Sequence, residues 1–283
     1  MDHAKYCYLI PRGGWNDCMQ CIDFTYKYCE RNGRILLLDT VNSRSDFNFS
    51  DLFDITLPNV IYDYEIIKQI INQDNITFYP KSLGKSIQDQ TFVYKHRGKI
   101  NGVPLTLPKT SVDADIIIYS TCGSGAMGFT FFEKYIKVNE NVVKYCITTL
   151  KNMKKENDRI VTTHIRNTDR KTDYVKLFEK YVQDFMQYDM LYICTDDNNV
   201  IEYYKNTYGF CYNNTSFPNN NYRNLHENDT ISGNVKMIDL LFDIYIVTVS
   251  HIFIDVKARN SNFTTFLSKC HQNKNIIEKF HIK

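Results

Sequence analysis

The stretch "IVTTHIRNTDRKTDY", residues 160–174, passes from an apolar strand pattern into a loop rich in charge. Residues 160–166 predict a β-strand, and a helix is expected to follow at 173–187. The apolar alternation ends at Arg166, so its guanidinium is expected at the carboxyl end of the strand. Ligands of open α/β sheets bind at that end. The stretch therefore predicts an α/β fold with Arg166 at its binding edge.

The charged loop after this strand has two interpretations. The planar fork of an arginine such as Arg166 matches a diphosphate bidentately. Alternatively, Arg166 or Arg170 pairs with Asp169 at the loop surface, an arrangement that is common and contributes little energy. Taken alone, these residues favour the surface ion pair, so the rest of the chain must decide.

Strands and helices alternate on both sides of this stretch, which indicates two α/β halves. The N-terminal half opens with a strand, a helix and a strand at 7–10, 18–32 and 34–39, a β-α-β unit with parallel strands. Further strands are expected at 114–120, 190–196 and 251–255, and helices at 63–73, 129–136, 140–151, 198–207, 234–245 and 263–271. A charged segment at 151–159 reads as a linker, which predicts domains at 1–150 and 151–283.

Composition restricts the class of protein. Hydrophobic residues make up 43% of the 283 residues and aromatic residues 14%, as in a globular chain. The net charge of +2 excludes a surface that attracts nucleic acid or anionic membranes as a whole, so no nucleic-acid partner is expected. No apolar run of about 18 residues is found, so we expect no membrane span. The expected location is cytoplasmic, in a bacterium or in a host cell infected by a large virus.

The cysteines favour packing over chemistry. Nine Cys residues, an odd number in a chain with no export signal, indicate reduced thiols. Cys18 and Cys21 form a C-x-x-C, but no second pair stands at zinc-site spacing. We therefore expect these two cysteines to pack within a helix, and no bound metal.

The stretch "PRGGWNDCMQ" (11–20) joins the first strand to the first helix through Gly13 and Gly14. Glycines let backbone N–H groups come close to a phosphate or a sugar. Asn16 and Asp17 stand at the helix entrance, where a tight turn with a helix cap explains them equally well.

Two more stretches place polar side chains at element ends. "YICTDDNN" (192–199) puts Thr195 and Asp196 just past a buried strand, where helix capping or a divalent metal site would also use them. "RNSNFTTFL" (259–267) puts Ser261, Asn262 and Thr264 at a helix start, where a phosphate gains from the helix dipole and exposed amides. Capping accounts for one of these side chains more readily than for all of them.

Four of these motifs together resemble a known family. They are "GGWND" (13–17), "HIRNTDR" (164–170), "TDD" (195–197) and "NFTTF" (262–266). In this order and at this spacing they are similar to motifs of the fucosyltransferase-like glycosyltransferases of the GT-B type. That group includes the α-1,6-, nodulation, α-1,2- and protein O-fucosyltransferases. The motifs lie in both halves of the chain, while residues 42–110 match nothing in the family pattern.

The resemblance implies a GT-B fold, in which two Rossmann-like domains face each other across a cleft. It further implies an inverting, metal-independent transfer of a sugar from a nucleotide diphosphate to a glycan hydroxyl. L-fucose from GDP-fucose is the expected donor, and no further cofactor is expected. Domain 1–150 would take the acceptor glycan or glycoconjugate, and domain 151–283 would bind the nucleotide-sugar.

The resemblance also implies roles for single residues. Arg166 would grip the β-phosphate and stabilise the leaving group, with help from Arg170. His164 would lie beneath the base or ribose through main-chain contacts, and Asp239 would accept from guanine N1–H and N2–H. The remaining donor-site residues would be Gly13, Gly14, Asn16, Thr195, Asp196, Ser261, Asn262 and Thr264.

An inverting transfer needs a base for the acceptor hydroxyl. The resemblance leaves Asp17 and Asp173 as candidates, with a slight preference for Asp17 because acceptors dock on the N-terminal half in this architecture. Asn167 stands where many fucosyltransferases have a second arginine. This departure leaves two alternatives open: another donor such as UDP-xylose, which would make the protein a xylosyltransferase, and a catalytically inactive protein that binds sugar nucleotides or glycans.

Overall fold

The computed structural model of the chain forms two compact units, Met1–Lys137 (unit 1) and Val138–Lys283 (unit 2). It describes residues 4–43, 45–92, 94–95, 99–108, 111–120, 128–168, 171–218, 225, 228–256 and 261–280. The boundary falls ahead of helix α6 (Glu140–Met153), whereas the sequence predicted it at 150/151. The reason is that α6 buries an apolar face and packs on helix α9 (Gly233–Val249) of unit 2.

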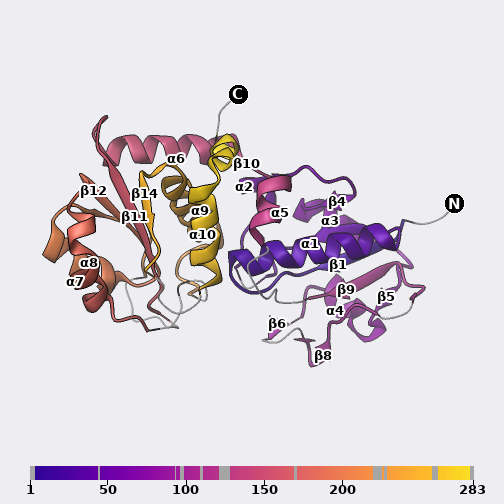
Figure 1. The fold of residues 1–283 in the computed structure, drawn as a ribbon. Helices are drawn as coiled ribbons and strands as arrows, with labels where there is room; N and C mark the ends of the chain where they lie inside the picture. Colours follow the sequence, from indigo (N-terminus) through magenta and orange to yellow (C-terminus); the bar gives the residue numbers. More distant parts are fainter. Residues whose placement is uncertain are drawn as a thin grey trace. The chain divides into compact units, whose positions relative to one another are not determined.

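Unit 1 is built on a parallel sheet of five strands in the order β4-β2-β1-β9-β5 (Figure 1). Strands β1 (Tyr6–Leu9) and β2 (Ile35–Leu38) flank helix α1 (Trp15–Arg31), which confirms the predicted β-α-β unit. The sheet also contains β9 (Ile116–Tyr119) and the short strands β4 (Val60–Ile61) and β5 (Phe78–Tyr79).

The two faces of this sheet are covered by different helices. Side chains of one face, such as Tyr8, Leu37 and Ile118, form a core with helices α3 (Tyr64–Ile71) and α4 (Gly84–Gln88). Helix α1 packs against strands β1 and β2 and against helix α5 (Gly128–Tyr135). The smaller elements of this part of the chain are α2 (Phe49–Leu52), η1 (Lys81–Leu83), β3 (Phe53–Ile55) paired with β10 (Ile136–Val138) at the unit boundary, and an antiparallel sheet of β6 (Tyr94–Lys95), β7 (Lys99–Ile100) and β8 (Val103–Pro104).

Arg34 closes the amino-terminal edge of the unit 1 sheet. Its side chain is 6% exposed, and its guanidinium donates to the carbonyls of Tyr6, Val112 and Ala114 at 3.1, 2.8 and 2.9 Å. Buried carbonyls need such donors because an unpaired polar group costs about 1–3 kcal/mol. Arg34 thus joins the starts of β1, β2 and β9.

Unit 2 contains a second parallel sheet, in the order β13-β12-β11-β14. The long central strands β11 (Ile160–Ile165) and β12 (Met190–Thr195) are buried throughout, as expected for a sheet covered on both faces. Their neighbours are β13 (Cys211–Tyr212), in a segment expected to be loop, and β14 (Ile252–Ile254).

Alternation along β11 and β12 divides their side chains between two helical layers. Val161, Ile165 and Leu191 pack with helices α7 (Tyr174–Phe185) and α8 (Asn198–Tyr208). Thr162, His164 and Tyr192 point to the opposite face, where helices α9 and α10 (Asn262–Gln272) lie (Figure 1). The short helix η3 (Lys274–Phe280) follows α10. The polar side chains of Thr162, His164 and Tyr192 therefore face helices α9 and α10.

Arg34→Met should lower the free energy of unfolding of unit 1 by about 2–4 kcal/mol, since it removes the guanidinium donor from one buried and two partly buried carbonyls. The fluorescence of Trp15, the one tryptophan of the sequence, reports urea unfolding of unit 1. Lys5→Met is the control, because it removes an ion pair with Asp113 whose side chains are 42% and 97% exposed. It should change stability by less than about 0.5 kcal/mol. Equal effects of the two substitutions would contradict the role of Arg34.

Candidate functional site

His164, near the carboxyl end of β11, is the central side chain of the site in unit 2. Its Nδ1 lies 2.7 Å from Thr264 Oγ1, and both residues are 7% exposed. The ring of Phe263 meets the imidazole edge-on, with centroids 5.3 Å apart. His164 therefore attaches the first turn of α10 to the end of β11.

Burial keeps this imidazole neutral. It lowers the pKa of His164 to about 4, and the charge of Arg166 lowers it as well, while Asp196 and Asp255 act in the opposite sense. Among the described residues, the charges that act on the ring are therefore the guanidinium of Arg166 and the carboxylates of Asp196 and Asp255.

The first turn of α10 carries the three predicted phosphate-binding side chains. Ser261 is the N-cap, and its Oγ accepts from Thr264 N at 3.4 Å. Ser261 and Thr264 are buried, whereas Asn262 is exposed. The structure thus brings Ser261 and Thr264 together with His164, and each of the two hydroxyls also has a structural task.

Asp196, just past β12, holds the loop that follows β11. One carboxylate oxygen accepts from the backbone N–H groups of Asn167 and Thr168 at 2.8 and 3.2 Å, and the other accepts from Thr168 Oγ1 at 2.5 Å. The carboxylate expected to form the pocket wall therefore fastens the backbone directly after Arg166. Thr195, beside it, is buried and accepts from Asp197 N at 3.3 Å.

Asn167, at the position of the absent second arginine, fastens the same loop from inside. It is 4% exposed, donates through Nδ2 to Asp197 Oδ2 at 2.7 Å and accepts through Oδ1 from Thr172 N at 2.8 Å. Thr172 Oγ1 in turn donates to the carbonyl of Arg166 at 2.7 Å. Together with Asp196, these bonds define the backbone position of half-buried Arg166. We name the Asp196 and Asn167 bonds the Arg166 clamp.

Two of the predicted charges near this loop have other outcomes. Arg170 and its neighbour Asp169 lie outside the described residues. Asp173 is the exposed N-cap of α7, where it accepts from Lys176 N at 3.2 Å and pairs with Lys176 Nζ at 3.2 Å. These hydrogen bonds lower the pKa of Asp173, so its carboxylate is a weaker base than an ordinary aspartate.

Helix α9 contributes two buried carboxyls, Asp239 and Asp243. The sequence predicted a role only for Asp239. Asp239 accepts from Ser216 N at 2.7 Å, and burial raises its pKa. Asp243, one turn later, accepts from Tyr192 OH at 2.7 Å. Burial, with a contribution from Asp239, raises the pKa of Asp243 to about 8. The sequence signal for this pair was two acidic residues spaced i, i+4 within an apolar helix.

In unit 1, the glycine loop enters α1 at the carboxyl end of β1. Gly13 has φ +92°, a left-handed conformation that glycine adopts without strain, and Gly14 is the N-cap of α1. A Cβ on Gly14 would meet no atom within 4 Å. Room therefore exists over the backbone at Gly14, and Asp17 lies in the first helical turn beside it.

The other residues of this segment pack inside unit 1. Trp15 is 5% exposed, stacks on Phe53 at 5.0 Å and meets Phe132 edge-on at 5.8 Å, so it is a core residue and not a platform for a sugar. Cys18 and Cys21 are buried, and Cys18 Sγ donates to Gly13 O at 3.5 Å. This burial agrees with the packing role expected of the C-x-x-C.

Asn16 is 3% exposed, and its backbone carbonyl lies against Gly128. A Cβ at position 128 would come within 2.3 Å of that carbonyl oxygen. The backbone at the start of α1 therefore contacts the backbone of Gly128, at the start of α5, with no side chain between them.

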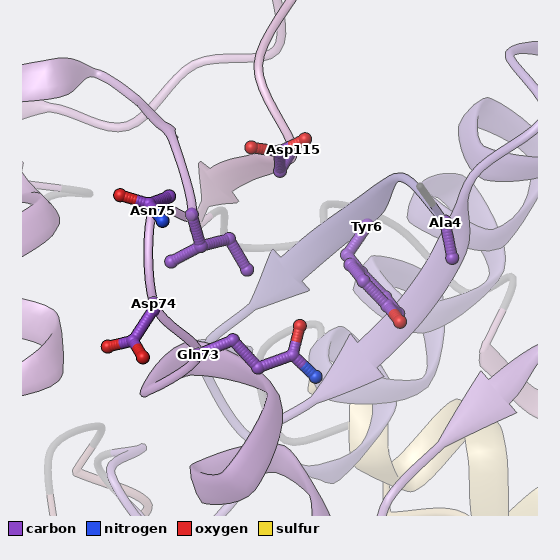
Figure 2. A pocket seen from close by; sticks show the side chains of 7 residues that line it. Ala4, Tyr6, Gln73, Asp74, Asn75 and Asp115 are labelled. Atoms are coloured by element: carbon purple, nitrogen blue, oxygen red, sulfur yellow. The ribbon is translucent and has the colours of Figure 1, made fainter. Parts of the chain in front are cut away.

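A pocket of about 310 Å³ lies at the opposite end of the unit 1 strands (Figure 2). Its lining includes Tyr6 and Asp115, which stand at the starts of β1 and β9, and Gln73, Asp74 and Asn75 from the loop after α3. Because ligands of parallel sheets bind at the carboxyl ends of strands, this pocket is not the predicted site.

The described residues contain no group of three or more His, Cys, Asp or Glu side chains arranged to hold a metal ion. None of the helices they form combines the length and apolar character needed to cross a bilayer.

No protein-family model matches the sequence, and no curated protein matches it as a relative. Solved structures do match. NodZ alpha-1,6-fucosyltransferase co-crystallised with GDP has a TM-score of 0.58 and 16% identity, covering 93% of this chain and 92% of that chain. The fucosyltransferase NodZ from Bradyrhizobium has a TM-score of 0.57 and 17% identity, with 93% of each chain covered. NodZ soaked with GDP-fucose has a TM-score of 0.56 and 15% identity, covering 93% and 91%.

These likenesses extend over both units of the chain. They confirm, at the level of the fold, the resemblance inferred from the four motifs. The protein has the GT-B type of fold, with two Rossmann-like units.

Gly14→Ala should leave the stability of unit 1 within about 0.5 kcal/mol of wild type, because φ is −74° and the new methyl group enters open space. Gly13→Ala should cost about 1–2 kcal/mol at its positive φ. Urea unfolding followed by Trp15 fluorescence measures both. A large loss of stability in Gly14→Ala would mean that the chain itself, and not a ligand, requires glycine at this position.

Asp243→Asn should stabilise unit 2 increasingly as the pH rises. An aspartate whose pKa is raised by folding binds more protons in the native than in the unfolded state between its two pKa values. Stability from Asp243 is therefore lost as the pH rises from about 4 to about 8. Thermal melts followed by circular dichroism should show the variant gaining on wild type by at least about 1 kcal/mol between about pH 5 and about pH 8. Asp184→Asn, an exposed carboxyl of α7, should show no such trend.

Proposed function

We propose that the protein is a glycosyltransferase that moves a sugar from a nucleoside diphosphate to a hydroxyl of a glycan or glycoconjugate, with inversion. GDP-fucose is the proposed donor. The observation that carries the proposal is the clamped Arg166 beside neutral His164 and the start of α10. This arrangement stands at the carboxyl ends of parallel strands in a fold shared with structures solved with GDP and GDP-fucose.

Arg166 would supply the main electrostatic contribution. In the transfer, the acceptor oxygen bonds to the anomeric carbon while the bond from that carbon to the diphosphate oxygen breaks. Negative charge then collects on the departing diphosphate, and a preorganised guanidinium stabilises it without a bound cation. The Arg166 clamp supports this role, because a loop held by five hydrogen bonds, three of them from backbone N–H groups, reorganises little during reaction.

The first turn of α10 would hold the diphosphate from the other side. Its backbone amides and helix dipole favour an anion. Ser261 and Thr264 add hydroxyls at the same helix end, and exposed Asn262 adds an amide. A neutral His164 adds no competing charge at neutral pH.

For the base that takes the acceptor proton, the geometry favours Asp17. Asp173 caps α7, pairs with Lys176 and has a lowered pKa, which makes it a poor proton acceptor. Asp17 lies in the first turn of α1 next to the open space over Gly14. The acceptor hydroxyl would bind there and transfer its proton to the Asp17 carboxylate as the new glycosidic bond forms.

Asp239 is the proposed partner of the guanine base. Its carboxylate already accepts from the backbone N–H and from the side chain of Ser216, and a base would add further donors to the same group. Asp243 offers a second carboxyl on the same helix. A donor with another base, such as UDP-xylose, is the alternative that a nucleotide titration would separate.

Calorimetric titration with GDP and with UDP tests donor and site together. Wild type should bind GDP more tightly than UDP. Arg166→Ala should weaken GDP binding about tenfold or more and reduce transfer from GDP-fucose by at least about 100-fold. Arg159→Ala is the matched control, because Arg159 precedes the same strand and its side chain is 57% exposed.

Three results would count against parts of this proposal. Unchanged transfer in Arg166→Ala would remove the phosphate role of that residue. A clear preference for UDP would remove the guanine role of Asp239 and favour the xylosyl alternative. Nucleotide binding without transfer to any glycan acceptor would indicate an inactive binding protein.

A further inference from the structure

We infer that His164 is a positioning residue for the diphosphate: its ring occupies the accepting side of the Thr264 hydroxyl and so directs the hydroxyl proton to the ligand. The inference rests on the proposed function and specifies how the α10 end of the site would hold its anion. Its basis is the 2.7 Å contact between His164 Nδ1 and Thr264 Oγ1, made where both side chains are buried.

The direction of this hydrogen bond decides what Thr264 can offer. If the ring carries its proton on Nδ1, it donates to Thr264 Oγ1, and the hydroxyl keeps its own proton for another acceptor. If the proton is on Nε2, the hydroxyl must donate to Nδ1 and has no proton left to give. Phosphate oxygens only accept at neutral pH, so a diphosphate at this helix end selects the Nδ1–H form.

Ser261 is arranged in the same way at the N-cap. Its Oγ accepts from Thr264 N at 3.4 Å, so its O–H proton is the group it has to donate. With the ring proton on His164 Nδ1, two hydroxyls of one helical turn have their accepting sides occupied by the protein itself. Such a pair complements an anion and would be a poor partner for a hydrogen-bond donor.

The packing around His164 fixes the position of its ring relative to helix α10. The Phe263 ring lies edge-on to the imidazole at 5.3 Å, and Thr264 is anchored at its backbone by the Ser261 cap. His164 itself is the last but one residue of β11, a strand paired on both sides. Its ring therefore has few ways to turn away, and the Thr264 hydroxyl is oriented before a ligand arrives.

Titration with GDP and with guanosine tests the inference, because guanosine has the base and ribose but no phosphate. Thr264→Val removes the hydroxyl with little change in shape, and His164→Leu removes the ring nitrogen. Each should weaken GDP binding about tenfold and leave guanosine binding unchanged. The double variant should bind GDP no more weakly than either single variant, because both remove the same hydrogen bond.

Conservative variants separate positioning from a general loss of structure. Thr264→Ser keeps a hydroxyl, and His164→Asn places an amide nitrogen near the position of Nδ1. Both should restore GDP affinity to within about threefold of wild type. Thermal melts of Thr264→Val should show an intact fold, so a loss of binding in that variant would not reflect unfolding.

The outcomes are distinguishable. GDP binding unchanged in Thr264→Val and His164→Leu would overturn the inference and leave the proposed function standing. Equal weakening of guanosine and GDP would also overturn it, since the effect would then reach the base and not the phosphate. Failure of wild type to bind GDP or UDP would overturn the proposed function and the inference with it. If wild type prefers UDP, the same variants are compared with UDP and uridine.

Discussion

The arrangement of unit 2 depends on the hydrogen bonds that the carboxylate of Asp196 accepts. This carboxylate joins the ends of the two central strands by accepting from two backbone amides and a hydroxyl of the loop after β11. An acid at this position would normally repel a phosphate. Because both oxygens of Asp196 accept from the loop, this acid holds Arg166 at the strand end. Its negative charge also raises the pKa of His164, whereas burial lowers it. Asp196 thus supports the backbone of its neighbours Asn167 and Thr168.

The two units use different physical means to prepare a site. Unit 2 relies on a dense set of hydrogen bonds among short polar side chains such as Asn167, Thr172 and Asp197. Unit 1 relies on the absence of a side chain at Gly14 and on the left-handed turn at Gly13. The first means suits a ligand with concentrated charge, and the second suits a close approach of backbone to ligand.

Much of the fold could be predicted from the sequence, because long apolar strands and amphipathic helices have strong local patterns. The β1-α1-β2 unit and the central strands of unit 2 are cases in point. The domain boundary could not be predicted from the sequence. The unit to which α6 belongs depends on its packing against α9, which is far away in sequence. Strand β13 is two residues long and lies in a polar segment, so periodicity could not reveal it.

The site was predicted in its residue types more than in its roles. His164, Thr264 and Ser261 do meet, yet nothing local shows that the contact runs between the imidazole and the Thr264 hydroxyl. Asp243 escaped notice because its significance comes from Tyr192 on a strand about fifty residues earlier. Asn167 looked like a lost arginine, and only its partners in the fold show that it has a task of its own.

The contact between Asn16 and Gly128 has a mechanical consequence for unit 1. The carbonyl of Asn16 lies so close to position 128 that even a methyl group would not fit. The start of α1 and the start of α5 are therefore packed backbone against backbone, and any side chain at position 128 would force the two helix ends apart.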